Sequence, residues 1–199
     1  MNLATTSGPD TVRGPADECK PAVRALPVLR DDHVRPDICA PCGGRCCKAL
    51  PGAAMPEDFG ADDAAIRAAM KERLVTGEWS IDWWEGDPRP DTYEADRGYF
   101  LRPATRAGRG DVFDPSNGGT CVFFEDGKGC RIFEARPSGC RGLEPVTGNG
   151  DCNVRYASKQ DAAVAWLPYA AMIVEVGEEL GEDPPDDPPP FASWMGGFR

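Results

Sequence analysis

The sequence predicts a small α+β protein with many loops, in which the cysteines organise the core. The chain has 199 residues, about the size of one domain with tails. Its 23 glycine and 20 proline residues favour loops over long regular elements. Four of its nine cysteines lie within residues 39–47. We expect a short β-hairpin, two or three helices and flexible termini.

Composition divides the chain into three parts. Residues 1–37 mix proline, glycine and charged residues with few bulky side chains, so we expect a flexible amino-terminal arm. This arm contains Cys19 and the only histidine, His33, and we expect neither to belong to the site. Residues 38–181 form the predicted cysteine-cluster domain, and residues 182–199 form an acidic, proline-rich tail.

The tail carries three aromatic residues, Phe191, Trp194 and Phe198, on an arm that we expect to be extended. They suit a docking peptide for a protein partner. They equally suit a segment that folds back on its own domain, and the sequence leaves both readings open.

A helix is predicted after the first cysteine group. Asp62 and Asp63 suit its amino-terminal end, where negative charge is favourable, and Gly77 suits its carboxyl-terminal end. Apolar residues recur between them at helical spacing: Ile66, Ala69, Met70 and Leu74.

A tryptophan-rich segment follows this helix, with Trp79, Ile81, Trp83 and Trp84 inside six residues. Such a density of large apolar side chains favours burial in the core. The alternative is a lid over the neighbouring cysteines.

Strands are predicted in the middle of the chain. Residues 97–103 read as a short strand, and residues 118–133 read as two strands around the turn Asp126-Gly127-Lys128-Gly129. This hairpin brings Cys121 and Cys130 close together.

The last predicted helix begins at Ser158, where Asp161 three residues later suits a capping box, and it ends at Gly181. Its apolar face includes Trp166, Tyr169, Met172, Ile173, Val176 and Leu180. Because proline lacks a backbone N–H, Pro168 should kink this helix or divide it in two.

Charge and hydropathy exclude several classes of partner. The formal net charge of −11 disfavours nucleic acid and anionic membranes, which both reward clustered lysine and arginine. The amino terminus lacks the pattern of a signal peptide, and no stretch approaches about 20 consecutive apolar residues. We therefore expect a cytoplasmic protein. Because cytosolic thiols are kept reduced and the number of cysteines is odd, structural disulfides are disfavoured.

The cysteines outside the arm form two groups of four, which suggests metal binding. A Cys-x-x-Cys turn such as Cys39–Cys42 directs two sulfurs toward one point, and thiolate is the metal ligand. Segments 39–48 and 121–155 together carry seven basic residues against five acidic ones. Basic neighbours lower thiol pKa values and offset thiolate charge, although a solvated basic face would show the same pattern. The candidate metal ligands are Cys39, Cys42, Cys46, Cys47, Cys121, Cys130, Cys140 and Cys152.

Spacing favours iron, as an iron–sulfur cluster, over Zn²⁺. The second group is spaced by eight, nine and eleven residues, unlike the repeated Cys-x-x-Cys turns of a zinc ribbon. We expect the adjacent side chains of Cys46 and Cys47 to diverge, which suits a cluster or two centres better than one tetrahedral ion. Zn²⁺ is the alternative.

The motif around the second group resembles the YkgJ-type cysteine-cluster family, the zinc- or iron-chelating CxxCxxCC domain of bacteria. The likeness covers residues 39–155, and three residues rather than two separate Cys42 from Cys46. The family pattern is a cysteine, a hydrophobic pair and then Arg-Pro-x-x-Cys-Arg. It is met by Cys130, Ile132, Phe133, Arg136, Pro137, Cys140 and Arg141.

The resemblance implies that all eight cysteines outside the arm are candidate ligands. Because of the altered spacing, either Cys46 or Cys47 is the family counterpart. Arg45, Arg136 and Arg141 are expected to lie near sulfur and to help bind the cofactor, although Arg136 could instead pair with Glu134 or Glu144 at the surface.

Three functions remain open. The first is a metal-binding protein in metal or electron handling, or an accessory to a partner. The second is an enzyme that uses the centre, since a flagellin lysine methylase is similar in its cysteine cluster, and a pocket lined by Trp83 and Trp84 would favour this reading. The third is a structural zinc module that presents the tail to a partner.

Overall fold

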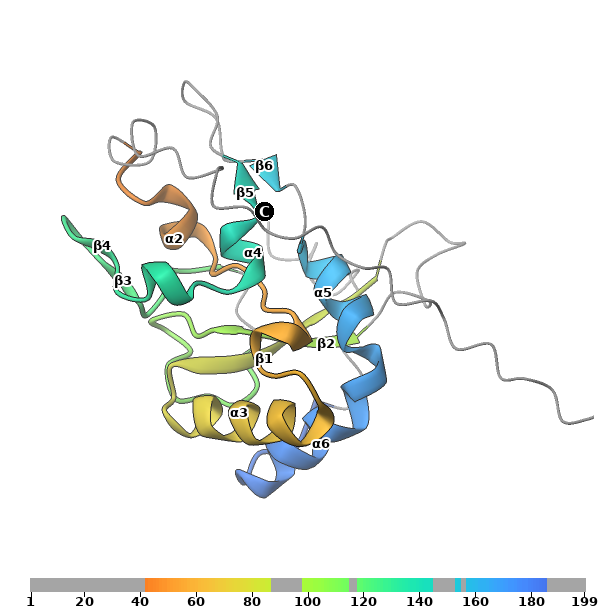
Figure 1. Ribbon diagram of the computed structural model, residues 1–199. Helices are drawn as coiled ribbons and strands as arrows, with labels where there is room; N and C mark the ends of the chain where they lie inside the picture. Colours follow the sequence, from red (N-terminus) through yellow and green to blue (C-terminus); the bar gives the residue numbers. More distant parts are fainter. Residues whose placement is uncertain (1–41, 87–97, 115–117, 145–152, 155–156, 186–199) are drawn as a thin grey trace, which may run out of the picture.

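The computed structural model describes residues 42–86, 98–114, 118–144, 153–154 and 157–185 (Figure 1). They form helices and two-stranded antiparallel sheets, which confirms the predicted α+β class. The predicted arm, Cys39, Cys152 and the aromatic residues of the tail lie outside the described residues. The helical elements are α2 (Arg45–Ala49), η2 (Pro56–Asp58), α3 (Asp63–Val75), η3 (Phe133–Ala135), α4 (Ser138–Arg141), α5 (Lys159–Trp166), η4 (Leu167–Tyr169) and α6 (Ala170–Glu179).

The longest strands, β1 (Trp79–Trp84) and β2 (Gly98–Pro103), pair antiparallel from Trp79↔Pro103 to Trp84↔Gly98. Alternate residues of a strand face opposite sides of its sheet. Trp79, Ile81 and Trp83 therefore share one face, and all three are buried. This confirms the core reading of the tryptophan-rich segment and shows that the segment is a strand.

Two further pairs are short. The predicted hairpin is present, because β3 (Phe124–Glu125) pairs antiparallel with β4 (Gly129–Cys130). A pair that the sequence did not predict, β5 (Leu143–Glu144) with β6 (Asn153–Val154), follows α4.

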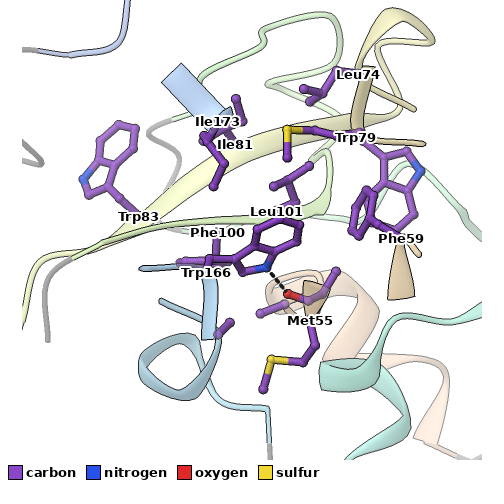
Figure 2. Close-up of a cluster of buried hydrophobic side chains, with 14 of the residues drawn as sticks. Met55, Phe59, Leu74, Trp79, Ile81, Trp83, Phe100, Leu101, Trp166 and Ile173 are labelled. Carbon is purple, nitrogen blue, oxygen red and sulfur yellow. Dashed lines mark hydrogen bonds between the residues drawn. The ribbon is translucent and has the colours of Figure 1, made fainter. Parts of the chain in front are cut away.

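Helices cover both faces of the β1–β2 sheet. Leu74 of α3 and Ile173 of α6 lie on one side of the strands, and Phe100 of β2 and Trp166 of α5 lie on the other (Figure 2). The indole N–H of Trp166 donates to the carbonyl oxygen of Ala54 at 2.8 Å, which satisfies the polar atom of a fully buried ring. None of the helices in the described ranges has the length and apolar character that crossing a bilayer requires.

Local signals set the ends of these helices as expected. The carboxylate of Asp62 accepts from the backbone N–H of Ala65 and caps α3. Ser158 and Asp161 form a reciprocal capping box at the start of α5. Pro168 lies in the 3₁₀ turn η4 that separates α5 from α6, so the predicted helix is divided in two.

Two segments outside the β1–β2 sheet pair with β2 or with the residues just after it. Ala54 pairs with Leu101 in an isolated bridge, with its N–H 2.7 Å from the carbonyl oxygen. Thr105, just beyond β2, pairs in the same way with Cys121. The strand thus connects the hydrophobic core to two segments that lead to cysteines.

A buried ionic network anchors β2. Arg102 has no exposed area, and its Nε donates to Asp82 Oδ2 at 2.6 Å. Its Nη2 donates to Asp114 Oδ2 at 3.1 Å. Thr105 Oγ1 donates to the same oxygen, and Lys159 Nζ lies 3.3 Å from Asp82 Oδ2. Buried charges of this kind require their partners, because an unpaired ion in the interior is costly.

Replacing Arg102 with methionine should lower the free energy of unfolding by about 3–5 kcal/mol, because two buried carboxylates lose the guanidinium that they share. Chemical denaturation measures the change. Arg109→Met is the matched control, since Arg109 is 60% exposed in its ion pair with Glu78 and should change stability by less than about 1 kcal/mol. Equal, small losses in both variants would contradict the role assigned to the network.

Candidate metal centre

Six of the eight predicted cysteine ligands are described: Cys42, Cys46, Cys47, Cys121, Cys130 and Cys140. Each is a free thiol. Helices α2 and α4 and the β3–β4 hairpin, which carry or adjoin most of them, lie at one end of the molecule, away from α3 and α6 (Figure 1). The fold therefore brings cysteine-bearing segments that are remote in sequence to the same region.

Cys46 and Cys47 of the first group lie on α2, which follows a tight turn. Gly44 has φ 75°, and a Cβ there would lie 2.3 Å from the ring of Phe124, so only glycine fits. The Sγ atoms of Cys46 and Cys47 lie 4.0 Å apart. The expectation that these adjacent side chains diverge is wrong, because the two sulfur atoms lie within 4.0 Å of each other.

This separation is close to the sulfur–sulfur distance in a tetrahedral thiolate site, about 3.8 Å for a metal–sulfur bond of about 2.3 Å. Cys46 and Cys47 are therefore placed so that one ion could contact both sulfurs. The interaction with the neighbouring Cys47 thiol, together with burial, raises the pKa of Cys46 far above its ordinary value.

Cys121 joins the first group to the hairpin. Its N–H donates to the carbonyl oxygen of Cys47 at 2.7 Å. Burial raises the pKa of the Cys121 thiol, and Cys130 raises it further, whereas the backbone N–H groups of Phe123 and Phe124 lower it. The electrostatic coupling between Cys121 and Cys130 agrees with the predicted proximity across the hairpin. N–H groups directed at sulfur stabilise the thiolate that a metal requires.

Cys140 approaches the same region from α4. Burial raises the pKa of its thiol to about 12, and Cys121, Cys46 and Cys130 add to the shift. The thiol of Cys140 therefore feels the charge of cysteines on α2 and around the hairpin. The backbone N–H of Gly52 opposes the shift by favouring the thiolate. A Cβ on Gly52 would lie 2.8 Å from Cys140 Sγ, so this glycine lets the two segments meet.

Comparison with known proteins identifies the family of the chain. A family model, CxxCxxCC, described as a "Putative zinc- or iron-chelating domain", matches residues 38–162. The chain belongs to the CxxCxxCC family. No curated protein and no solved structure matches the chain.

The structure describes all three arginines that were expected to help bind a cofactor. Arg45 is exposed on α2. Arg136 donates from Nε to the carbonyl oxygen of Phe133 at 2.7 Å and stacks 3.7 Å from the centroid of that ring. Arg141 forms an ion pair with Asp58 at 2.7 Å. A role of these three side chains in binding a cofactor stays a prediction.

Two contributors to the site were missed in the sequence. Gly52 contacts Cys140, and Asp58 binds both ends of α4. These contacts span 80 or more residues, so no local spacing pattern signals them. A third residue, Arg102, lies on β2 and favours the thiolate of Cys121 through its charge.

The donor set suits the metals named for the family. Thiolates bind both zinc and iron, and the described candidates are thiols partly or fully shielded from water. Within the described residues, no three cysteine, histidine, aspartate or glutamate side chains are grouped closely enough to hold one ion. Two candidate ligands, Cys39 and Cys152, lie outside those residues.

Metal affinity should rise with pH. Because burial raises the pKa of the Cys140 thiol to about 12, this thiol carries a proton near neutral pH and must lose it to bind a metal. Each proton released makes binding about tenfold tighter per pH unit. Competition of Zn²⁺ with a chelator between about pH 6.5 and pH 8 measures this slope.

Cys140→Ser should reduce the slope by about one proton. Cys19→Ser, which changes a cysteine that we place outside the site, is the control and should leave the slope unchanged. A slope of zero in the unmodified chain would contradict thiol ligation.

Proposed function

We propose that this CxxCxxCC domain binds iron through its clustered cysteines, as an iron–sulfur cluster, with Zn²⁺ as the alternative metal. One observation carries the proposal: three segments that are remote in sequence approach one another, because the N–H of Cys121 donates to the carbonyl oxygen of Cys47 at 2.7 Å and Gly52, five residues after Cys47, packs against Cys140 Sγ. The proposed ligands are Cys39, Cys42, Cys46, Cys47, Cys121, Cys130, Cys140 and Cys152.

The chain's own groups support thiolate ligation in two ways. Backbone N–H groups of Gly52, Phe123 and Phe124 favour the thiolate forms of Cys140 and Cys121. The basic residues of segments 39–48 and 121–155 reduce the repulsion among several thiolates in an otherwise acidic protein. When bound, an iron–sulfur cluster would supply one-electron redox chemistry, whereas zinc would supply structural support.

The number of thiols favours a cluster. A single tetrahedral ion uses four ligands, whereas eight cysteines lie outside the arm. The close approach of Cys46 and Cys47 removes the geometric objection to one ion contacting both, so the preference for iron–sulfur rests on ligand count and spacing. Two zinc ions would use the same thiols and are the competing result.

The proposed role is metal or electron handling, or assistance to a partner in the cytoplasm, with the tail as the protein contact. The net charge of −11 supports a role without nucleic acid or an anionic membrane as partner. A pocket lined by Trp83 and Trp84 would favour an enzyme. Trp83 is only 3% exposed and packs in the core, so this observation does not favour catalysis.

Anaerobic purification should yield protein with iron, acid-labile sulfide and visible absorption. Cys42→Ser and Cys140→Ser should each lose most of the metal, because each removes a proposed ligand. Cys19→Ser is the matched control and should keep the metal content of the unmodified chain.

The competing outcomes separate the hypotheses. Colourless protein with stoichiometric zinc, lost in the same two variants, would overturn iron while keeping thiolate ligation. Protein that holds neither iron nor zinc, or variants that retain all their metal, would contradict the proposal.

A further inference from the structure

We propose that Asp58 is a positioning residue for the metal centre: its carboxylate fixes helix α4 and thereby orients the thiol of Cys140. The inference rests on the proposed function, because it assigns Asp58 a role in a centre that Cys140 helps to build. Asp58 is not itself a ligand in this account. It acts through the residues on either side of Cys140.

Both oxygens of the Asp58 carboxylate accept hydrogen bonds from α4. Oδ2 accepts from the backbone N–H of Ser138 at 2.8 Å. Oδ1 accepts from Ser138 Oγ at 3.0 Å and from Arg141 Nη2 at 2.7 Å. The Asp58 side chain is 7% exposed, so these charge-assisted bonds are largely shielded from water. One carboxylate therefore binds the first and the last residue of the helix.

Helix α4 depends on such contacts because it has only four residues. A helix this short is unstable by itself, since the cost of ordering the first turn is not recovered. Besides the bonds to Asp58, the N–H of Gly139 donates to the carbonyl oxygen of Ala53 at 2.7 Å. Cys140 follows Ser138 and Gly139 directly, so the position of its thiol is set by these anchors.

Asp58 is itself attached to the core. Its Oδ2 accepts from the backbone N–H of Met55 at 2.9 Å, which closes the turn η2. Its carbonyl oxygen accepts from Arg73 Nη2 at 2.8 Å. The Arg73 guanidinium lies 4.2 Å from the ring centroid of Phe59 and 4.8 Å from that of Trp79. A continuous series of contacts therefore runs from strand β1 through Arg73 and Asp58 to α4.

This arrangement also gives the last arginine of the Arg-Pro-x-x-Cys-Arg motif a specific partner. Arg141 Nη2 contacts Asp58 Oδ1 and Ser138 Oγ, which are 2.7 Å and 3.0 Å away. The guanidinium thus supports the side of α4 that Asp58 holds. The ion pair between Arg141 and Asp58 therefore helps to fix α4 and, with it, Cys140.

The test is site-specific alkylation of the thiols in the protein as isolated, with the metal content of each sample measured in parallel. In the unmodified chain, Cys140 should react slowly with iodoacetamide because it is held in the centre. In Asp58→Asn, Cys140 should react about tenfold faster while Cys121 keeps its slow rate, because only α4 has lost its anchor.

Two further variants complete the design. Glu57→Gln changes the exposed neighbour of Asp58 and should leave the rate at Cys140 unchanged. Ser138→Ala removes one bond to Asp58 and should accelerate Cys140 by a smaller factor. It keeps the inference testable if Asp58→Asn does not fold.

Three results decide the outcome. Acceleration of Cys140 alone supports the positioning role. The positioning role would be overturned if, in both Asp58→Asn and Ser138→Ala, alkylation of Cys121 and Cys140 accelerated equally or neither accelerated. This holds even where the unmodified chain contains metal. An unmodified chain that holds no metal would instead refute the proposed function, and the positioning role in a centre would fail with it.

Discussion

Backbone pairing to strand β2 is the constraint on which the candidate centre depends. Leu101 of β2 pairs with Ala54, whose neighbour Ala53 accepts from the N–H of Gly139 beside Cys140. Thr105, two residues beyond β2, pairs with Cys121. Cys121 then binds the carbonyl of Cys47, which joins α2 to the same frame. Arg102 of β2 forms buried ion pairs with Asp82 and Asp114, and these hold the strand in the interior. The protein interior thus helps to place the segments that carry these cysteines.

Much of the fold could be predicted because its signals are local. Asp62 caps α3, Ser158 and Asp161 cap α5, and Pro168 separates α5 from α6, each through contacts within a few residues. The hairpin turn between β3 and β4 is equally local. The strand character of residues 79–84 was missed, although the alternation of Trp79, Ile81 and Trp83 was a readable sign of it.

The sequence named candidate donors but not the contacts around them. Cysteine counting gave the candidate thiols, whereas the contacts of Gly52 and Asp58 with α4 depend on tertiary folding across 80 or more residues. The geometry of Cys46 and Cys47 was predicted wrongly from ideal helix angles, because backbone directions about 100° apart do not fix where the two sulfur atoms lie, and these are 4.0 Å apart. The role of the buried network around Arg102 likewise became visible only once β1 and β2 were paired.

X-ray absorption at the metal edge of the anaerobically isolated protein tests the central claim most directly. Shared thiolate ligation predicts a first shell of sulfur at about 2.3 Å with no need for nitrogen or oxygen. A first shell made only of nitrogen and oxygen at about 2.0–2.2 Å would contradict a centre built from these cysteines.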